Sequence, residues 1–430
     1  MRWHLLFAVP FLLCSISGAK PFPIEGNAAD SLRQFYEARH GALAWSGDPK
    51  AALHARQALA VLSRAAGDGL DAERYRVFVA GDDQKANDTS LSRAVLAYMR
   101  DVSIGQSELG SVDADVALPS RSPPFAAMLD QALSKDRLTE MLESLAPRHP
   151  EYLALKAALP DSGDKSDIVA ANMERWRWLP PALEPNRIMV NAADSQLELW
   201  LDGKPVLTSR VIVGKPSNPT PILRAEGAGL TVNPPWTVPR SIAVKEILPK
   251  LKRNRGWLAS HDMVLLDGPP GDPQGLHINW RAIPAGTFPY QIRQYPGPRN
   301  PLGQIKLELP NRFDVYLHDT SDRIAFGRSE RHLSHGCVRV EQILPLASYA
   351  LAADLSAMQK ITDAIARNET TFIPLQKRLP VYFLYWTAVA APEGGLKYHS
   401  DIYGRDRRMI AVMRAGRLRV AAIDQPCMKG

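Results

Sequence analysis

Long apolar runs are scarce in this 430-residue chain, and the one of note lies at its start. Arg2 precedes an apolar stretch over residues 5–13, which is too short to span a bilayer, and the small residues Ser17 and Ala19 follow. This order predicts a signal peptide over residues 1–19, cut after Ala19, and therefore export of the mature protein. Cys14 raises the alternative of a lipoprotein signal, but Leu13 is a poor fit to the small residue needed before it.

Clusters of one charge are also missing. The net charge is +7, but the lysines and arginines are scattered, with no basic run of the kind that marks a nucleic-acid surface. We therefore expect no nucleic-acid partner, whereas attraction to anionic wall polymers or membrane surfaces stays open. With 45% hydrophobic and 23% charged residues, the chain has the composition of a soluble protein with sizeable cores. Its length predicts two or three domains.

Cysteine is rare as well, with three in the whole chain. Removal of the signal peptide takes Cys14 away and leaves Cys337 and Cys427. A disulfide between these two is one interpretation for an exported protein. Cys427 lies close to the C-terminus in a polar tail, which argues against it. We favour a free, functional Cys337.

The pattern along the chain predicts an α+β protein with several domains. Residues 20–180 carry alanine and leucine at helical spacing, as in 51–66, 90–102 and 124–145, and predict a helical scaffold domain. Residues 161–167 are a polar linker, and 168–179 predict a short helix before two prolines. From residue 187 the apolar residues alternate, which indicates strands over 187–191, 196–201 and 206–213, with Asp202-Gly203 as a hairpin turn.

The β-rich part predicts a catalytic domain over residues 185–378, of sandwich or open-barrel type. A mixed insertion over about residues 239–286 interrupts it, and we interpret this insertion as a mobile lid over a site. A helix is predicted over about 342–367. Residues 379–430 are predicted as a C-terminal extension that contains a strand and ends in a hairpin.

The chemistry is concentrated in residues 316–341, YLHDTSDRIAFGRSERHLSHGCVRVE. A cysteine nucleophile needs a base for its proton, backbone donors for the oxyanion and a fixed approach for the acyl group. His318 ends a predicted strand, and Gly336 permits a tight turn in which the amides of Gly336 and Cys337 point at one oxygen. The residues alone thus favour cysteine acyl transfer without settling it.

The sequence resembles the L,D-transpeptidase catalytic domain family of the YkuD type. The family signature is a histidine, a spacer, a serine or threonine and then His-Gly-Cys; here His318 is followed by fifteen residues and Ser334-His335-Gly336-Cys337. The resemblance extends to the large Gram-negative subfamily that forms 3-3 cross-links and has an N-terminal scaffold domain. It covers most of residues 30–406 and includes 211–216 (VIVGKP), 233–241 (NPPWTVPRS), 300–306 (NPLGQIK), 316–320 (YLHDT) and 381–386 (VYFLYW).

This resemblance implies a periplasmic peptidoglycan enzyme without a cofactor, whose partners are stem peptides and other cell-wall enzymes. It implies Cys337 as nucleophile and His318 as base, acting through a cysteinyl thioester that releases D-Ala and forms a 3-3 diaminopimelate cross-link. It also implies acylation by carbapenems. The supporting and oxyanion residues would be His335, Ser334 and Gly336, and the substrate-binding candidates are Arg339, Tyr316, Trp236 and Asp319.

Alternatives stay open at this point. The same thioester with another acceptor would give an L,D-carboxypeptidase, a D-amino acid exchange enzyme or a protein-to-wall anchoring enzyme, and a non-catalytic wall-assembly scaffold is a further reading. His332 and His335 could join His318 and Cys337 in a zinc site, although their crowding suits a nucleophile loop better. The short linker leaves no room for the peptidoglycan-binding module that the subfamily often carries.

Overall fold

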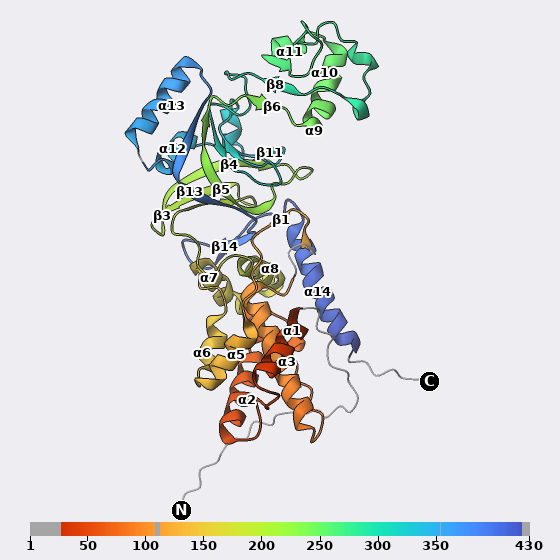
Figure 1. Ribbon diagram of the computed structural model, residues 1–430, viewed down its shortest axis with the longest axis vertical. Helices are drawn as coiled ribbons and strands as arrows, with labels where there is room; N and C mark the ends of the chain where they lie inside the picture. Colours follow the sequence, from red (N-terminus) through yellow and green to blue (C-terminus); the bar gives the residue numbers. More distant parts are fainter. Residues whose placement is uncertain (1–26, 108–111, 353, 424–430) are drawn as a thin grey trace, which may run out of the picture. The chain divides into compact units, whose positions relative to one another are not determined.

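A computed structural model describes residues 27–107, 112–352 and 354–423 (Figure 1). The chain divides into two compact units: one comprises residues up to 114, 119–182 and 387 onward, and the other comprises 115–118 and 183–386. The predicted signal peptide and Cys427 lie outside the described residues. Within the described ranges, no helix combines the length and the apolar character needed to cross a membrane.

The first unit contains the predicted scaffold helices. Asp48 accepts the amide hydrogen of Ala51 at the start of α2, and Asp83 caps α3 in the same way. Gly105, with a φ of 96°, ends α3. The helices are α1 (Asn27–Ala38), α2 (Pro49–Leu62), α3 (Gln84–Ile104), α5 (Phe125–Ser134), α6 (Leu138–Ser144), α7 (Pro150–Ala158) and α8 (Ser166–Arg177). The apolar faces of α1, α2, α3, α5 and α6 meet in one core around Phe35, Val95, Met99 and Leu129.

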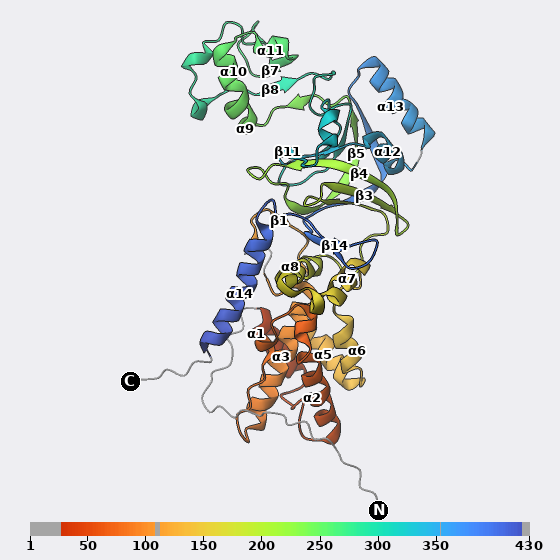
Figure 2. The same cartoon turned by 180° about the vertical axis from the view of Figure 1, so that it is seen from behind.

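Two predicted helices are each two helices in the structure. The prediction over 124–145 is wrong at its centre, because Asp136 adopts a left-handed φ of 56° and separates α5 from α6. The prediction over 342–367 is interrupted in the same way by Ala352, with a φ of 53°. This gives α12 (Ile343–Ala350) and α13 (Leu355–Arg367), and Asp354 caps the second helix. Figure 2 shows α12 and α13 from the opposite side.

The C-terminal region differs from the prediction. The strand expected after residue 379 is the second half of β13 (Thr371–Leu384), which lies inside the main sheet of the second unit. Beyond it, β14 (Ala388–Ala390) and β15 (Leu396–Tyr398) form a hairpin in the first unit, followed by α14 (Arg405–Ile423) instead of further strands. Asp401 starts this helix by accepting the amide hydrogens of Arg405 and Asp406.

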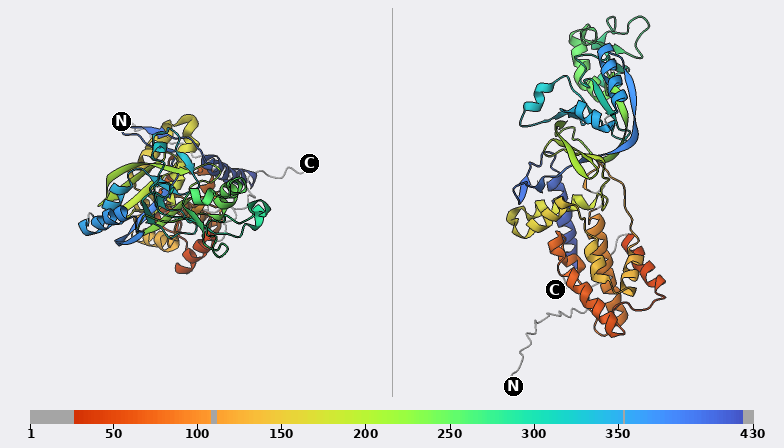
Figure 3. Two further views of the ribbon diagram at one scale, coloured as in Figure 1. Left: turned by 90° about the horizontal axis from the view of Figure 1, so that it is seen from above. Right: turned by 90° about the vertical axis from the view of Figure 1, so that its left-hand side faces the viewer.

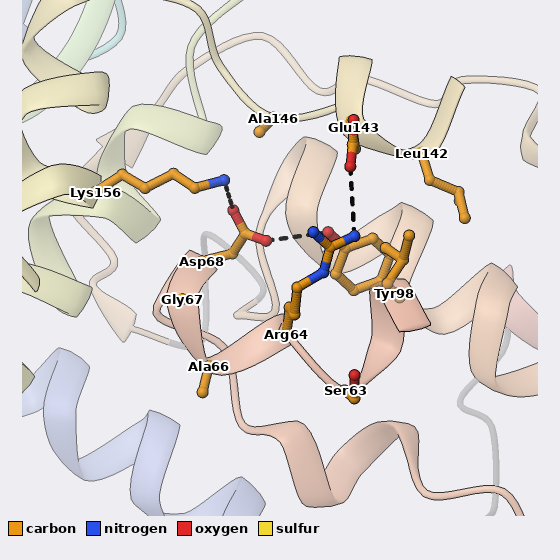
Figure 4. Close-up of a pocket in the computed structure, with 11 residues that line it drawn as sticks. Ser63, Arg64, Ala66, Gly67, Asp68, Tyr98, Leu142, Glu143, Ala146 and Lys156 are labelled. Carbon is orange, nitrogen blue, oxygen red and sulfur yellow. Dashed lines mark hydrogen bonds and ion pairs between the residues drawn. The ribbon is translucent and has the colours of Figure 1, made fainter. Parts of the chain in front are cut away.

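The scaffold unit contains a cavity of about 670 Å³, lined by residues of α2, α3, α6 and α7 and of the segments that follow α2 and α6 (Figure 4). Its charged groups pair with one another. Asp68 contacts Lys156 at 2.5 Å and accepts a hydrogen bond from Tyr98 at 3.0 Å, and Arg64 contacts Glu143 at 3.4 Å. The cavity is therefore a place where the scaffold's own charges are satisfied.

The second unit is built on one large sheet. Asp202 and Gly203 both have positive φ, as a two-residue hairpin turn requires, and they join β3 to β4 as predicted. The main strands are β2 (Arg187–Asn191), β3 (Gln196–Leu201), β4 (Lys204–Gly214), β5 (Ile222–Val232), β9 (Ile305–Glu308), β10 (Leu317–His318), β12 (Val338–Val340) and β13. The short β1 (Val116–Ala117) pairs with β5, and β11 (His332–Ser334) pairs with β4.

The pairing closes this sheet on itself. Its order is β5-β13-β2-β3-β4-β12-β10-β9, and β9 pairs again with β5. A closed sheet has no free edge along this circuit, and its neighbouring strands are held in a fixed register. The fold is therefore α+β, with a helical first unit and a barrel-like second unit (Figure 3).

The insertion expected over 239–286 forms a small subdomain with its own core. It begins at β6 (Trp236–Thr237) and returns at β8 (Ile292–Gln294), which pairs with β6 and with β7 (Met263–Leu265). Between these strands lie α9 (Arg240–Ile242), a π-helical turn (Ala243–Ile247), α10 (Leu248–Arg253) and α11 (Trp257–Ser260). Leu251, Trp280 and Phe288 are fully buried in its core. The insertion is thus a folded element rather than a loose loop.

Candidate active site

Three neighbouring strands bring the predicted site residues onto one face of the sheet. His318 in β10 lies opposite Lys306 of β9 on one side and opposite Arg339 of β12 on the other. Residues opposite each other in adjacent strands share a face, and so do residues two apart along a strand. Tyr316 and Cys337 precede His318 and Arg339 by two residues, so they lie on the same face.

The register makes His318 and Cys337 diagonal neighbours. Tyr316 lies beside both: its ring meets the His318 ring edge to face, with centroids 5.5 Å apart, and its carbonyl accepts the amide hydrogen of Val338 at 3.0 Å. The strand pairing therefore places His318 and Cys337 on one face of the sheet, with Tyr316 beside both.

Cys337 is a half-buried free cysteine. Its thiol lies 3.6 Å from the carbonyl oxygen of Asp314, which can accept the thiol proton's hydrogen bond. Burial raises the pKa of Cys337, while hydrogen bonding from Tyr316 and the positive charge of Lys306 act in the opposite direction. In the resting site the sulfur is thus a protonated thiol; Tyr316 and Lys306 favour its thiolate, whereas Asp314 opposes it.

His318 is buried among cations. Burial lowers the pKa of His318 to about 3, and Arg339 and Lys306 contribute to the shift because like charges disfavour the imidazolium. Within the described part of the chain, Nδ1 of His318 has no hydrogen-bond partner, although the backbone of Asp319 and Leu302 lies near enough to favour protonation slightly. The ring is therefore neutral at neutral pH and has a lone pair available for a proton.

A tight turn holds the segment before Cys337. The hydroxyl of Ser334 accepts the amide hydrogen of Gly336 at 3.1 Å and donates to the carbonyl of Cys337 at 2.5 Å. Gly336 has a φ of 117°, which a side chain would disfavour. Thr220 donates to the Gly336 carbonyl at 2.8 Å and accepts from Gly214 at 2.9 Å, which ties this turn to the end of β4.

This geometry corrects the expected oxyanion site. Two amides were expected to point at one oxygen, but the amide of Gly336 is engaged by Ser334. The amide of Cys337 makes no hydrogen bond to any residue in the described ranges and can therefore donate to another group. Ser334 and Gly336 instead shape the turn that presents Cys337.

His335 points away from this face, toward the insertion. Its Nε2 lies 2.6 Å from the carboxylate of Glu246, in the π-helical turn, and 3.2 Å from the ammonium of Lys215. A π-helical turn is often found at a functional site. The contact joins the insertion to the residue two before Cys337, so the insertion and the cysteine turn are mechanically connected.

The other predicted substrate-binding residues, Asp319, Arg339 and Trp236, differ in their surroundings. Asp319 accepts the amide hydrogen of Gln304 at 2.9 Å and pairs with Arg323 at 2.9 Å, so its carboxylate orders a loop and does not hold the His318 ring. Arg339 is half-buried on the site face, and burial lowers its pKa. Trp236 packs against the core of the insertion. The structure thus places Tyr316 and Arg339 on the face that carries His318 and Cys337, whereas the Asp319 carboxylate has partners in a loop and the Trp236 ring packs in the insertion.

The side chains considered as zinc ligands are dispersed. His332 lies 3.3 Å from the hydroxyl of Ser195, and His335 contacts Glu246. In the described residues no three histidine, cysteine or acidic side chains are grouped as metal ligands would be.

Comparison with known proteins finds a family match in each of the two units. A Scaffold domain profile matches residues 30–159, and an L,D-transpeptidase catalytic domain profile of the YkuD type matches residues 185–362. The chain belongs to the L,D-transpeptidase family. A Haemophilus influenzae protein named provisionally as an L,D-transpeptidase is 34% identical over 284 residues, which are 65% of this chain and 57% of that protein. The match therefore spans little more than half the length of this relative.

Solved L,D-transpeptidases resemble the chain more distantly. A variant of the Enterococcus faecium enzyme is 14% identical, with 47% of this chain and 51% of that one covered and a TM-score of 0.19. Mycobacterium tuberculosis L,D-transpeptidase 1 is 11% identical, with 46% and 61% covered and a TM-score of 0.18.

Three residues at or next to the candidate site were not singled out from the sequence. Thr220 lies before β5 and bonds to the cysteine turn, Lys306 lies opposite His318 in β9, and Glu246 lies in the insertion and contacts His335. No spacing along the chain connects these residues to Cys337. Lys306 does end the NPLGQIK stretch that resembles the family, which is the signal by which it could have been found.

Proposed function

We propose that this L,D-transpeptidase cross-links peptidoglycan through a thioester on Cys337, with His318 as the general base. The observation that carries the proposal is the position of a free thiol, seated in a glycine turn, on the same sheet face as a buried neutral imidazole. A neutral imidazole can take a proton, and the thiolate that remains is the reactive nucleophile.

The first half-reaction forms the acyl-enzyme. His318 accepts the thiol proton as the sulfur attacks the carbonyl of the third, L-configured residue of a tetrapeptide stem. The amide of Cys337 donates to the oxyanion of the tetrahedral intermediate. The C–N bond then breaks, the imidazolium returns its proton to the departing amine, and D-Ala leaves.

The second half-reaction transfers the acyl group. The side-chain amine of diaminopimelate on another stem attacks the thioester, and His318 takes a proton from the attacking nitrogen. The C–S bond breaks, and the sulfur leaves as a thiolate that recovers the proton from His318. The product is a 3-3 cross-link. We further propose that the enzyme acts outside the cytoplasm, in the periplasm, after removal of residues 1–19.

Incubation with purified disaccharide-tetrapeptide tests this function. We expect a cross-linked dimer and free D-Ala from the wild-type protein and neither from Cys337→Ala, with product masses as the readout. Replacement of the insertion cation Lys252 by Ala is a control that leaves the sheet face intact. Undiminished dimer in Cys337→Ala would overturn the assignment, and tripeptide or a D-amino acid-exchanged product in place of dimer would mean that another acceptor is used.

Carbapenem acylation is a second test of the nucleophile. A β-lactam of this class carries a strained amide that a thiolate can open, so we expect a stoichiometric adduct on the peptide that contains Cys337. The mass of that peptide gives the answer directly. An intact thiol after prolonged incubation would argue against a reactive Cys337.

A further inference from the structure

A lysine in β9 reaches the site face from the side opposite Arg339. Lys306 is opposite His318 in the antiparallel pair β9–β10 and opposite Thr231 in the pair β9–β5. Its backbone is therefore held by strands on both sides, and it lies within the closed part of the sheet. Its side chain can reach only the neighbours that this register provides.

The position of the ammonium group is set by two contacts. Nζ of Lys306 lies 4.2 Å from the centre of the Tyr316 ring and 2.9 Å from the carboxylate of Glu308. Glu308 in turn accepts a hydrogen bond from Thr231 at 2.5 Å, which fixes the carboxylate. A cation over an aromatic face is attracted by the ring, and here the same ring lies beside Cys337.

Lys306 is therefore not an ordinary surface lysine. The lysine and its Glu308 partner are both largely buried, with side chains 21% and 29% exposed. Partly buried charges are screened less than exposed ones, so the field of this ammonium extends to the sulfur and the imidazole. The charges that face the thiol are Lys306, Asp314 and Arg339, and those that face the imidazole are Lys306 and Arg339.

We propose that Lys306, held by Glu308 and by the face of Tyr316, is a positioning residue that supplies positive charge for the Cys337 thiolate and keeps His318 in its base form. This inference rests on the proposed function, in which that thiolate attacks the stem. Lys306 and Arg339 then act from the two sides of His318. The direction of the pKa effects agrees: the charge of Lys306 lowers the pKa of both Cys337 and His318.

The pH dependence of thiol alkylation separates this role from a purely structural one. Iodoacetamide reacts with the thiolate, and mass analysis of the peptide containing Cys337 keeps Cys427 out of the measurement. Lys306→Met should move the midpoint of the alkylation profile upward by about one pH unit, a roughly tenfold loss of thiolate below the midpoint. Lys306→Arg, which keeps the charge, should stay near the wild-type midpoint.

Two further variants complete the design. Lys204→Met removes an exposed lysine at the β3–β4 hairpin of the same unit and should leave the midpoint unchanged. Glu308→Gln keeps Lys306 but removes its counter-charge, so it should move the midpoint downward, opposite to Lys306→Met. If Lys306→Met does not fold, the shift in Glu308→Gln alone tests whether the charge of Lys306 acts on Cys337.

The outcomes distinguish the inference from the proposed function. A midpoint unchanged in both Lys306→Met and Glu308→Gln would overturn the role of Lys306, even if Cys337→Ala abolishes cross-linking. Alkylation does not require peptidoglycan, so the expected shifts together with an absence of cross-linked product would leave the role of Lys306 intact and overturn the cross-linking function.

Discussion

Buried charged groups have different surroundings in the two units of this protein. In the scaffold, Glu174 and Arg177 are both fully buried and pair at 3.0 Å, and Glu174 also accepts the amide hydrogen of Ser107. In the catalytic unit, the buried imidazole of His318 has cations on both sides. The scaffold carboxylate and guanidinium compensate each other's burial, whereas the cations beside His318 disfavour protonation of its ring, and a pKa shifted in this way is common at functional sites.

The scaffold pair gives the largest expected effect on stability. Arg177→Met would leave the carboxylate of Glu174 buried without its partner, and we expect a loss of about 3–5 kcal/mol in the unfolding free energy of the scaffold unit. The double variant Glu174→Gln, Arg177→Met should recover much of this loss. Denaturant unfolding measures it. Arg137→Met, which breaks an exposed pair with Glu140, should change nothing measurable.

The buried ring of His318 should make the stability of the protein depend on pH. Because its pKa is lowered from the usual 6.5 to about 3 in the folded protein, the unfolded chain binds a proton below pH 6.5 that the folded chain does not. Stability therefore falls as the pH falls from 6.5 toward 3, by about 2 kcal/mol between pH 6.5 and 5. His318→Gln should abolish this part of the slope and lose activity by on the order of 10²–10⁴-fold. A wild-type pH slope in the variant would contradict the burial of a neutral ring.

The turn before the nucleophile gives a smaller effect. Thr220→Val keeps the shape of the side chain but removes its hydrogen bonds to Gly214 and Gly336, both buried. We expect about 1.5 kcal/mol of destabilisation and a slower acylation of Cys337. Thr237→Val, at an exposed position of β6, is the matched control. Equal behaviour of the two variants would mean that Thr220 does not hold the turn.

The bridge to the insertion gives the smallest effect. Glu246 and His335 are both partly exposed, and a pair of this kind contributes less than about 1 kcal/mol. Glu246→Gln should therefore change the acylation rate by no more than about fivefold. If the insertion is a mobile lid, as we predict, a protease should cut the insertion faster in this variant than in the wild-type protein. Unchanged cleavage would argue against the Glu246–His335 contact as a restraint on the insertion.

Part of this picture was readable from the sequence. The helical and β-rich regions, the Asp202-Gly203 turn and the cysteine turn are local, and each follows from periodicity or from residues adjacent in the chain. The breaks at Asp136 and Ala352 were missed, because a single left-handed residue that is not glycine carries little signal. The strand predicted after residue 379 belongs to β13, which pairs with strands far earlier in the chain, and local sequence does not indicate such a pairing.

The site was predictable to a similar extent. Cys337 and His318 stand out through their motif, but the cations beside His318 depend on strand register, which links residues 306, 318 and 339. Likewise, the capture of the Gly336 amide by Ser334 depends on a side-chain rotamer, and the contact of His335 with Glu246 depends on how an insertion folds. These contacts depend on the tertiary structure, and the spacing of residues along the chain does not indicate them.

The account depends on His318 acting as the base for Cys337, and the rate of carbapenem acylation tests this most directly. Intact-mass measurements over time at pH 7 should record a single adduct on the wild-type protein, none on Cys337→Ala, and a rate at least a hundredfold slower on His318→Gln. An adduct that forms on folded His318→Gln at the wild-type rate would contradict the account.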